Sequence, residues 1–162
     1  PLPDRAVLLS FDDGLQSVYT RAFPLLVAFH YPAIVGLVGG WLAEPAADQP
    51  PARYPAEHLS RNDFLSAAQI SEMQHSGLIE FASHTYQLHE GIPANPQGNL
   101  EPAAVARRFD ALSGSYETGP AHAERIRKDL ASSSSAVARL TGTPPRRVGV
   151  AAPRRSPPPT SA

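Results

Sequence analysis

Cysteine is absent from the 162 residues of this chain. Its absence excludes disulfides, thiolate metal ligands and cysteine nucleophiles, so any bound metal must be held by oxygen and imidazole nitrogen. An excess of one charge is also lacking, because 14 Lys and Arg nearly balance 15 Asp and Glu, for a net charge of -1. A near-neutral chain has no basic footprint for nucleic acid or an anionic membrane surface, and we expect neither as a partner.

Long hydrophobic runs are missing as well, since no apolar stretch reaches the roughly 20 residues that cross a bilayer. The chain begins without Met and shows no basic segment followed by an apolar stretch and a cleavage site. We therefore expect a piece of a longer product. Proline is abundant instead, with 18 residues. Its clusters predict a long irregular loop over 45–55 and a disordered Pro/Arg/Ser-rich tail over 151–162.

Residues 1–150 alternate between short apolar runs and segments with helical periodicity. The helix expected from Ser66 opens with a capping box to Gln69 and stops at Gly77. Strand followed by helix, repeated, predicts a parallel α/β domain, because crossover helices let consecutive strands run the same way. Strands are expected at 6–11, 33–38, 78–83 and 147–152, helices at 16–30, 66–76 and 121–140, and a looser stretch at 90–120.

Side chains with catalytic chemistry follow two of these strands. Asp12 and Asp13 end the first strand, and His84 follows the third, with His89 five residues later. Parallel α/β folds bind ligands at the carboxyl ends of their strands, so we expect these residues to converge. One carboxylate and two imidazoles can hold a divalent metal, and the second carboxylate stays free to accept a proton. This set of residues is typical of a hydrolase.

Simpler interpretations of the same residues exist. Asp followed by Gly is a common turn pair, and two loop histidines can be satisfied by backbone carbonyls. Two adjacent carboxylates repel each other, however, which favours a shared cation. The spacing of five between the histidines excludes a helical HExxH site. Iron oxygenases also use two histidines and one carboxylate, but usually on an all-β barrel, whereas this chain alternates strand and helix.

The segments SFDDG at 10–14 and SHTYQLH at 83–89 identify a resemblance. Through them the chain resembles the polysaccharide deacetylases of the NodB-homology type, carbohydrate esterase family 4. VGGWL at 38–42 and YETGPAHAERIRKDL at 116–130 are similar to members that act on β-1,6-linked N-acetylglucosamine exopolysaccharide in Gram-negative biofilms. The similarity covers roughly residues 4–148. It implies a distorted (β/α) barrel and a periplasmic or outer-membrane location.

The resemblance also implies roles for the four residues. Asp12 would be the general base, and Asp13, His84 and His89 would hold a divalent metal. Zn, Co, Ni or Fe is expected, since imidazoles suit borderline-soft ions better than Mg or Ca. The implied reaction is the hydrolysis of N-acetyl groups on an acetylated polysaccharide, with release of acetate. The alternatives are a deacetylase of chitin or peptidoglycan, and an inactive metal- or sugar-binding fragment.

One departure from the family affects the expected activity. Family members continue after the fourth strand with a Pro-Tyr-Gly type of motif whose backbone amide helps to bind the oxyanion. Here Val148 is followed by GVAAPRRSPPPTSA, which contains no such sequence. We therefore expect a domain truncated on its C-terminal side, with a C-terminal domain missing from this chain. Turnover should be slow or absent, because one oxyanion donor contributes about a hundred- to a thousandfold in rate.

Overall fold

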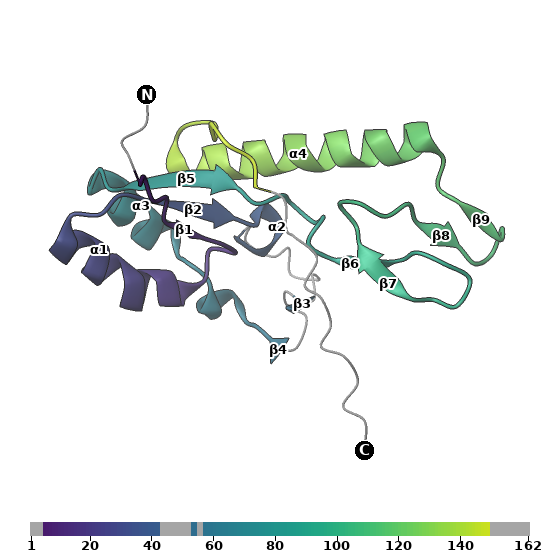
Figure 1. Cartoon of the computed structure of the whole chain (residues 1–162), viewed down its shortest axis with the longest axis horizontal. Coiled ribbons are helices and arrows are strands. Elements are labelled where there is room, and N and C mark those ends of the chain that lie inside the picture. The colour runs from purple at the N-terminus through teal and green to yellow at the C-terminus, as the bar shows by residue number, and fades with distance from the viewer. Residues whose placement is uncertain (1–4, 43–52, 55–56, 150–162) are drawn as a thin grey trace, which may run out of the picture.

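A three-stranded parallel sheet lies at the centre of the computed structural model, which describes residues 5–42, 53–54 and 57–149 (Figure 1). The strand order is β1-β2-β5, with β2 between its two neighbours. Every pairing is parallel, and β2 and β5 pair along all five of their residues, from Ala33 opposite Ile79 to Leu37 opposite Ser83. The predicted parallel α/β arrangement is therefore confirmed. The strands are β1 (Ser10–Phe11), β2 (Ala33–Leu37) and β5 (Ile79–Ser83).

The crossover helices follow the local signals in the sequence. A π-helical turn, η1 (Val18–Ala22), leads into α1 (Phe23–Phe29). Helical backbone already begins at Gln16, so the helix does not start late at Pro24; the π-helical residues Val18–Ala22 lie directly before Pro24, which falls in the first turn of α1. α3 (Ala67–His75) opens with the expected capping box from Ser66. α3 therefore begins where its own residues satisfy the free backbone groups, whereas α1 continues directly from η1.

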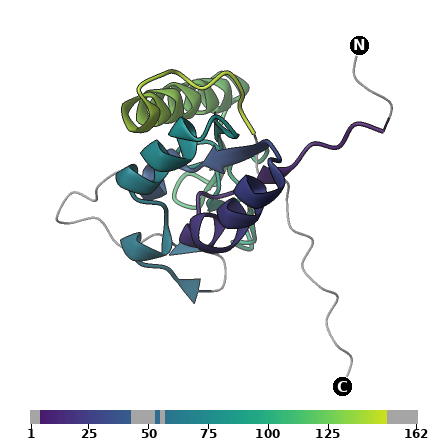
Figure 2. The same cartoon turned by 90° about the vertical axis from the view of Figure 1, so that its left-hand side faces the viewer.

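The longest helix is α4 (Gly119–Thr141), which runs from a Thr118 cap to Gly142 in the left-handed conformation. It lies beside β5, and α1 lies on the other side of the strands (Figures 1 and 2). None of the helices in the described ranges is long and apolar enough to cross a membrane. The remaining elements are α2 (Gly39–Leu42), η2 (Arg61–Asp63), β3 (Arg53–Tyr54), β4 (Glu57–His58), β6 (Gly91–Pro93), β7 (Leu100–Pro102), β8 (Phe109–Asp110) and β9 (Ser115–Tyr116).

One hydrophobic core joins the sheet to its helices. Val35, Leu37, Ile70, Met73 and Val137 are each fully buried and belong to this single cluster. Because Val137 comes from α4, the second half of that helix is fixed against the sheet by burial of apolar area, which contributes roughly 25 cal/mol per Å². The strands that end at the candidate site are therefore held in place by this packed core.

A smaller unit lies beyond the carboxyl ends of β2 and β5, under the first half of α4 (Figure 1). It contains two hairpins, β6-β7 and β8-β9, where the sequence predicted a looser stretch. Arg125 of α4 holds this unit, since its guanidinium donates to both carboxylate oxygens of Glu117 and to the carbonyls of Ala103 and Ala106. The hydrogen bonds from Arg125 also lower the pKa of the Glu117 carboxyl. These strands have two or three residues each, too few to show an alternating pattern in the sequence.

One predicted strand is shorter than expected, and another is described only in part. In the first run, 6–11, regular pairing covers Ser10 and Phe11, and Val7 is 84% exposed rather than buried. Ser10 pairs with Ile34 and β2 begins at Ala33, so the start of this run extends beyond the start of its partner strand. The fourth strand, 147–152, is seen as a parallel bridge between Val148 and Ser83. Its last residues, the 151–162 tail and most of the 45–55 loop lie outside the described residues.

Candidate metal centre

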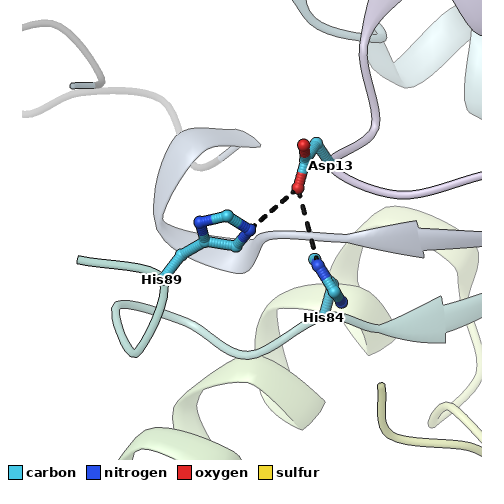
Figure 3. Close-up of side chains that lie close together, drawn as sticks. All are labelled: Asp13, His84 and His89. Atoms are coloured by element: carbon cyan, nitrogen blue, oxygen red, sulfur yellow. Dashed lines mark ion pairs between the residues drawn. The ribbon is translucent and has the colours of Figure 1, made fainter. Parts of the chain in front are cut away.

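Asp13, His84 and His89 point toward one another at the carboxyl end of the sheet (Figure 3). Oδ1 of Asp13 lies 3.1 Å from Nε2 of His89 and 3.5 Å from Nε2 of His84. The Asp13 and His84 side chains are 8% and 5% exposed, whereas that of His89 is 17% exposed. The cluster is therefore buried on two sides and reachable from the side of His89. The structure thus brings Asp13, His84 and His89 together, as the sequence predicted.

The donor set and its spacing fit a divalent metal. One ligand atom from each of the three residues lies within 4.8 Å of the others. Two ligand atoms about 2.1 Å from a tetrahedral zinc ion are about 3.4 Å apart, close to both distances from Asp13. Three protein ligands leave a fourth position open, as in catalytic rather than structural sites. Asp13, His84 and His89 are thus able to hold such an ion.

A left-handed turn brings the Asp13 carboxylate into the site. Asp13 has φ +73° and Gly14 has φ +69°, so two successive residues occupy a region that is uncommon for non-glycine residues but tolerated by Asp. The carbonyl of Gly14 accepts a hydrogen bond from the N–H of Leu65, which fixes the exit of the turn. The turn interpretation of Asp-Gly is therefore correct as well, because the turn itself aims one carboxylate inward.

His84 extends the pairing of β5 with β2 by one residue. Its N–H donates to the carbonyl of Leu37 at 2.8 Å, which fixes its backbone. On the neighbouring strand, a Cβ added at Gly36 would lie 3.2 Å from the His84 Cβ and 3.7 Å from Oδ1 of Asp12. Gly36 thus leaves room for the imidazole, a requirement that the sequence analysis missed. The isolated Gly in an otherwise apolar strand was the available signal.

Asp12 lies near the cluster but outside it. Its Oδ1 and the His84 side chain both lie within 4 Å of the position that a Cβ on Gly36 would occupy. The side chain is exposed, unlike that of Asp13, and Asp12 does not belong to the three-residue group that could hold a metal. The two adjacent carboxylates therefore have different environments, one inside the site and one at its solvent side.

Trp41 supports His89, which comes from a loop rather than from a strand end. The two rings are 4.9 Å apart between centroids, and Trp41 also contacts Phe64 at 5.5 Å. Trp41 is 9% exposed and belongs to α2, directly after β2. The sequence analysis gave this residue no role, although it is the single tryptophan of the chain. Its ring limits the positions that the His89 imidazole can adopt.

The backbone of α2 binds the loop between the two histidines. The N–H groups of Gly39 and Gly40 donate to the carbonyls of Thr85 and Tyr86 at 3.0 and 3.1 Å. A Cβ at Gly40 would lie 2.6 Å from the Tyr86 carbonyl oxygen, and real Cβ atoms do not come so close to other atoms. The Gly-Gly pair is therefore needed for the close approach of this loop, a requirement that the sequence analysis did not identify.

Comparisons with known proteins give a consistent family. A family model described as polysaccharide deacetylase matches residues 1–161. A poly-β-1,6-N-acetyl-D-glucosamine N-deacetylase of Escherichia coli K12 is 45% identical over 129 residues, which are 80% of this chain and 19% of that protein. The chain thus spans about a fifth of the length of this curated relative.

Solved structures agree in fold. The BpsB deacetylase domain of Bordetella bronchiseptica superposes with a TM-score of 0.85 at 43% identity, covering 93% of this chain and 56% of that one. A de-N-acetylase from Aggregatibacter actinomycetemcomitans superposes with a TM-score of 0.80 at 41% identity, covering 90% of this chain and 54% of that one. The described strands and helices therefore have counterparts in solved proteins of the same kind.

Proposed function

Because this chain belongs to the polysaccharide deacetylase family, we propose that it takes part in the hydrolysis of N-acetyl groups on a β-1,6-linked N-acetylglucosamine polysaccharide. The observation that carries the proposal is the convergence of Asp13, His84 and His89 at distances suited to a metal. The similarity to a relative named for β-1,6-linked N-acetylglucosamine supports the choice of glycan. A periplasmic or outer-membrane location stays a prediction.

The residues divide the reaction between them. Asp13, His84 and His89 would hold a divalent ion, which would supply Lewis-acid activation of water and of the acetamide carbonyl. The Asp12 carboxylate, exposed beside the site, accepts a proton from the attacking water. The water oxygen then bonds to the carbonyl carbon, the carbon–nitrogen bond breaks, and the proton lost by the water passes to the nitrogen, which leaves as the glucosamine amine. Acetate is the second product.

We also propose that the three parallel strands are part of a distorted (β/α) barrel. The bridge of Val148 to Ser83 supports a fourth parallel strand beside β5, continuing the order of the sheet. The match to 56% of the BpsB domain chain supports the division in which residues 1–150 form the N-terminal part of a deacetylase domain. The 151–162 tail, with its predicted disorder, lies outside the described residues.

The first prediction concerns the metal. After chelation, Zn²⁺, Co²⁺, Ni²⁺ or Fe²⁺ should bind to this chain at lower concentration than Mg²⁺ or Ca²⁺. Two of the three ligands are imidazoles, whereas Mg²⁺ and Ca²⁺ favour shells of oxygen atoms. Calorimetric titration of the chelated chain with each ion measures the order. Tight binding of Mg²⁺ with weak binding of Co²⁺ and Zn²⁺ would contradict the assignment of the ligands.

The second prediction tests the substrate. The Co²⁺-loaded chain should release acetate from a β-1,6-linked N-acetylglucosamine oligomer faster than from a β-1,4-linked oligomer of the same length. Acetate is measured enzymatically after long incubation, because slow turnover is expected, with Asp13→Ala as the blank. Faster release from the β-1,4 oligomer would favour a deacetylase of chitin or peptidoglycan. Bound metal without any acetate release would favour the metal- or sugar-binding fragment.

A further inference from the structure

We propose that Asp129, on α4, is a positioning residue for the metal centre. Its Oδ1 accepts a hydrogen bond from the N–H of Tyr86 at 2.8 Å, and its Oδ2 accepts one from the N–H of Gln87 at 2.6 Å. These two amides lie in the middle of the loop that joins His84 to His89. The inference rests on the proposed function, since it assigns Asp129 to the site in which those histidines hold the metal.

The loop needs such an anchor because its shape is not that of a regular element. Histidines five residues apart do not share one face of a helix, so the chain between them must bend. Thr85 bends it with φ +69°, an uncommon conformation for a β-branched residue that persists only where the surroundings enforce it. The Asp129 carboxylate uses both oxygens on two consecutive amides immediately after that bend. Charge-assisted bonds of this kind are about twice as strong as neutral ones.

A second contact from α4 lies one helical turn further on. Oγ of Ser133 and Oγ of Ser83 form a hydrogen bond of 2.7 Å, and both residues are fully buried. Ser83 directly precedes His84, and its Oγ also accepts a weak hydrogen bond from the N–H of Thr85 at 3.4 Å. α4 therefore holds the chain on both sides of His84. Residues at i and i+4 lie on the same face of a helix, so Asp129 and Ser133 face this segment together.

The usual alternative for a charged residue on a helix is a solvent-facing ion pair with its neighbours. The nearby cations on α4 have other partners, because Arg125 binds Glu117 and Lys128 lies 3.8 Å from Glu124. Asp129 is instead directed to the loop amides. The α2 backbone binds the loop carbonyls, so two helices hold the segment between the histidines.

The test compares Asp129→Ala with Asp110→Ala in the full chain. Asp110 is a matched control, since it also accepts hydrogen bonds from a loop amide, that of Leu112, and from the Ser113 hydroxyl, in the β8-β9 turn. Co²⁺ affinity is measured by calorimetric titration. Asp129→Ala should weaken it about 10- to 100-fold, the effect typical of losing a group that orients a metal ligand. Asp110→Ala should leave it unchanged.

A readout without metal separates this proposal from the site assignment. In chelated protein, amide hydrogen exchange at Tyr86 and Gln87 should accelerate in Asp129→Ala and not in Asp110→Ala. Unchanged exchange together with unchanged Co²⁺ affinity would overturn the role of Asp129. If Asp129→Ala loses its near-ultraviolet circular dichroism, and with it the native packing, Asp129→Asn is tested in its place. Because Asn has a single acceptor oxygen, amide exchange and Co²⁺ affinity should lie between those of the unmodified chain and those expected for complete loss of both hydrogen bonds. Values equal to those of the unmodified chain would overturn the role of Asp129. If Asp13→Ala retains Co²⁺, the proposed metal site is wrong. The amide exchange at Tyr86 and Gln87 is measured without metal, so it tests the role of Asp129 in that case too.

Discussion

Asp12→Asn should keep the Co²⁺ affinity of the unmodified chain, and in a full-length context it should lower acetate release from the β-1,6-linked oligomer about a hundred- to ten-thousandfold. The side chain of Asp12 is exposed beside the cluster and is not among the three residues whose ligand atoms converge. Asn has nearly the same shape as Asp but cannot accept the proton from water, and positioned general bases contribute rates of that order. Calorimetric Co²⁺ titration and enzymatic acetate measurement on the same samples separate the two effects.

Matched variants of the three convergent residues provide the contrast. Asp13→Ala and His89→Ala should both lose most of their Co²⁺ affinity, because each removes one of three protein ligands. Their acetate release should fall to that of chelated protein. If Asp12→Asn removes the metal as completely as His84→Ala does, the division of roles between the two adjacent carboxylates is wrong.

Gly40→Ala should destabilise the chain by about 1–3 kcal/mol, the usual range for forcing extra atoms into a packed contact. Gly40 belongs to the short helix α2, where propensity alone would make Ala more stable by up to about 1 kcal/mol. The new Cβ would lie 2.6 Å from the Tyr86 carbonyl oxygen, which is backbone and cannot rotate away. The loop between His84 and His89 must therefore move, and Co²⁺ affinity should fall together with stability.

Urea unfolding and Co²⁺ titration measure both consequences, and Gly119→Ala is the control. Gly119 also begins a helix, α4, but nothing lies within 4 Å of a Cβ placed there. Its replacement by Ala should leave affinity unchanged and stability unchanged or slightly higher. Equal behaviour of the two variants would show that the loop does not depend on close approach to α2.

Much of the fold could be predicted because its determinants are local. The capping box of Ser66 and the left-handed Gly77 act through hydrogen bonds to residues within one helical turn, and both are found where the sequence placed them. The apolar runs that became β2 and β5 are buried, so composition alone identified them. The run at 6–11 was judged by the same rule and was partly wrong, because burial of a strand also depends on how many neighbours it pairs with.

The four candidate site residues could be named from the sequence because polar groups that follow buried strands converge at one end of a parallel sheet. The sequence alone thus determined that Asp13 and His84 meet. It did not determine how His89 joins them, because that depends on atoms distant in the chain. The tertiary structure decided this through two helices that pack against the loop: α2 brings the ring of Trp41 and the bare backbone of Gly40, and α4 brings the carboxylate of Asp129. Such contacts leave no periodic pattern in the sequence, since they join single residues across tens of positions.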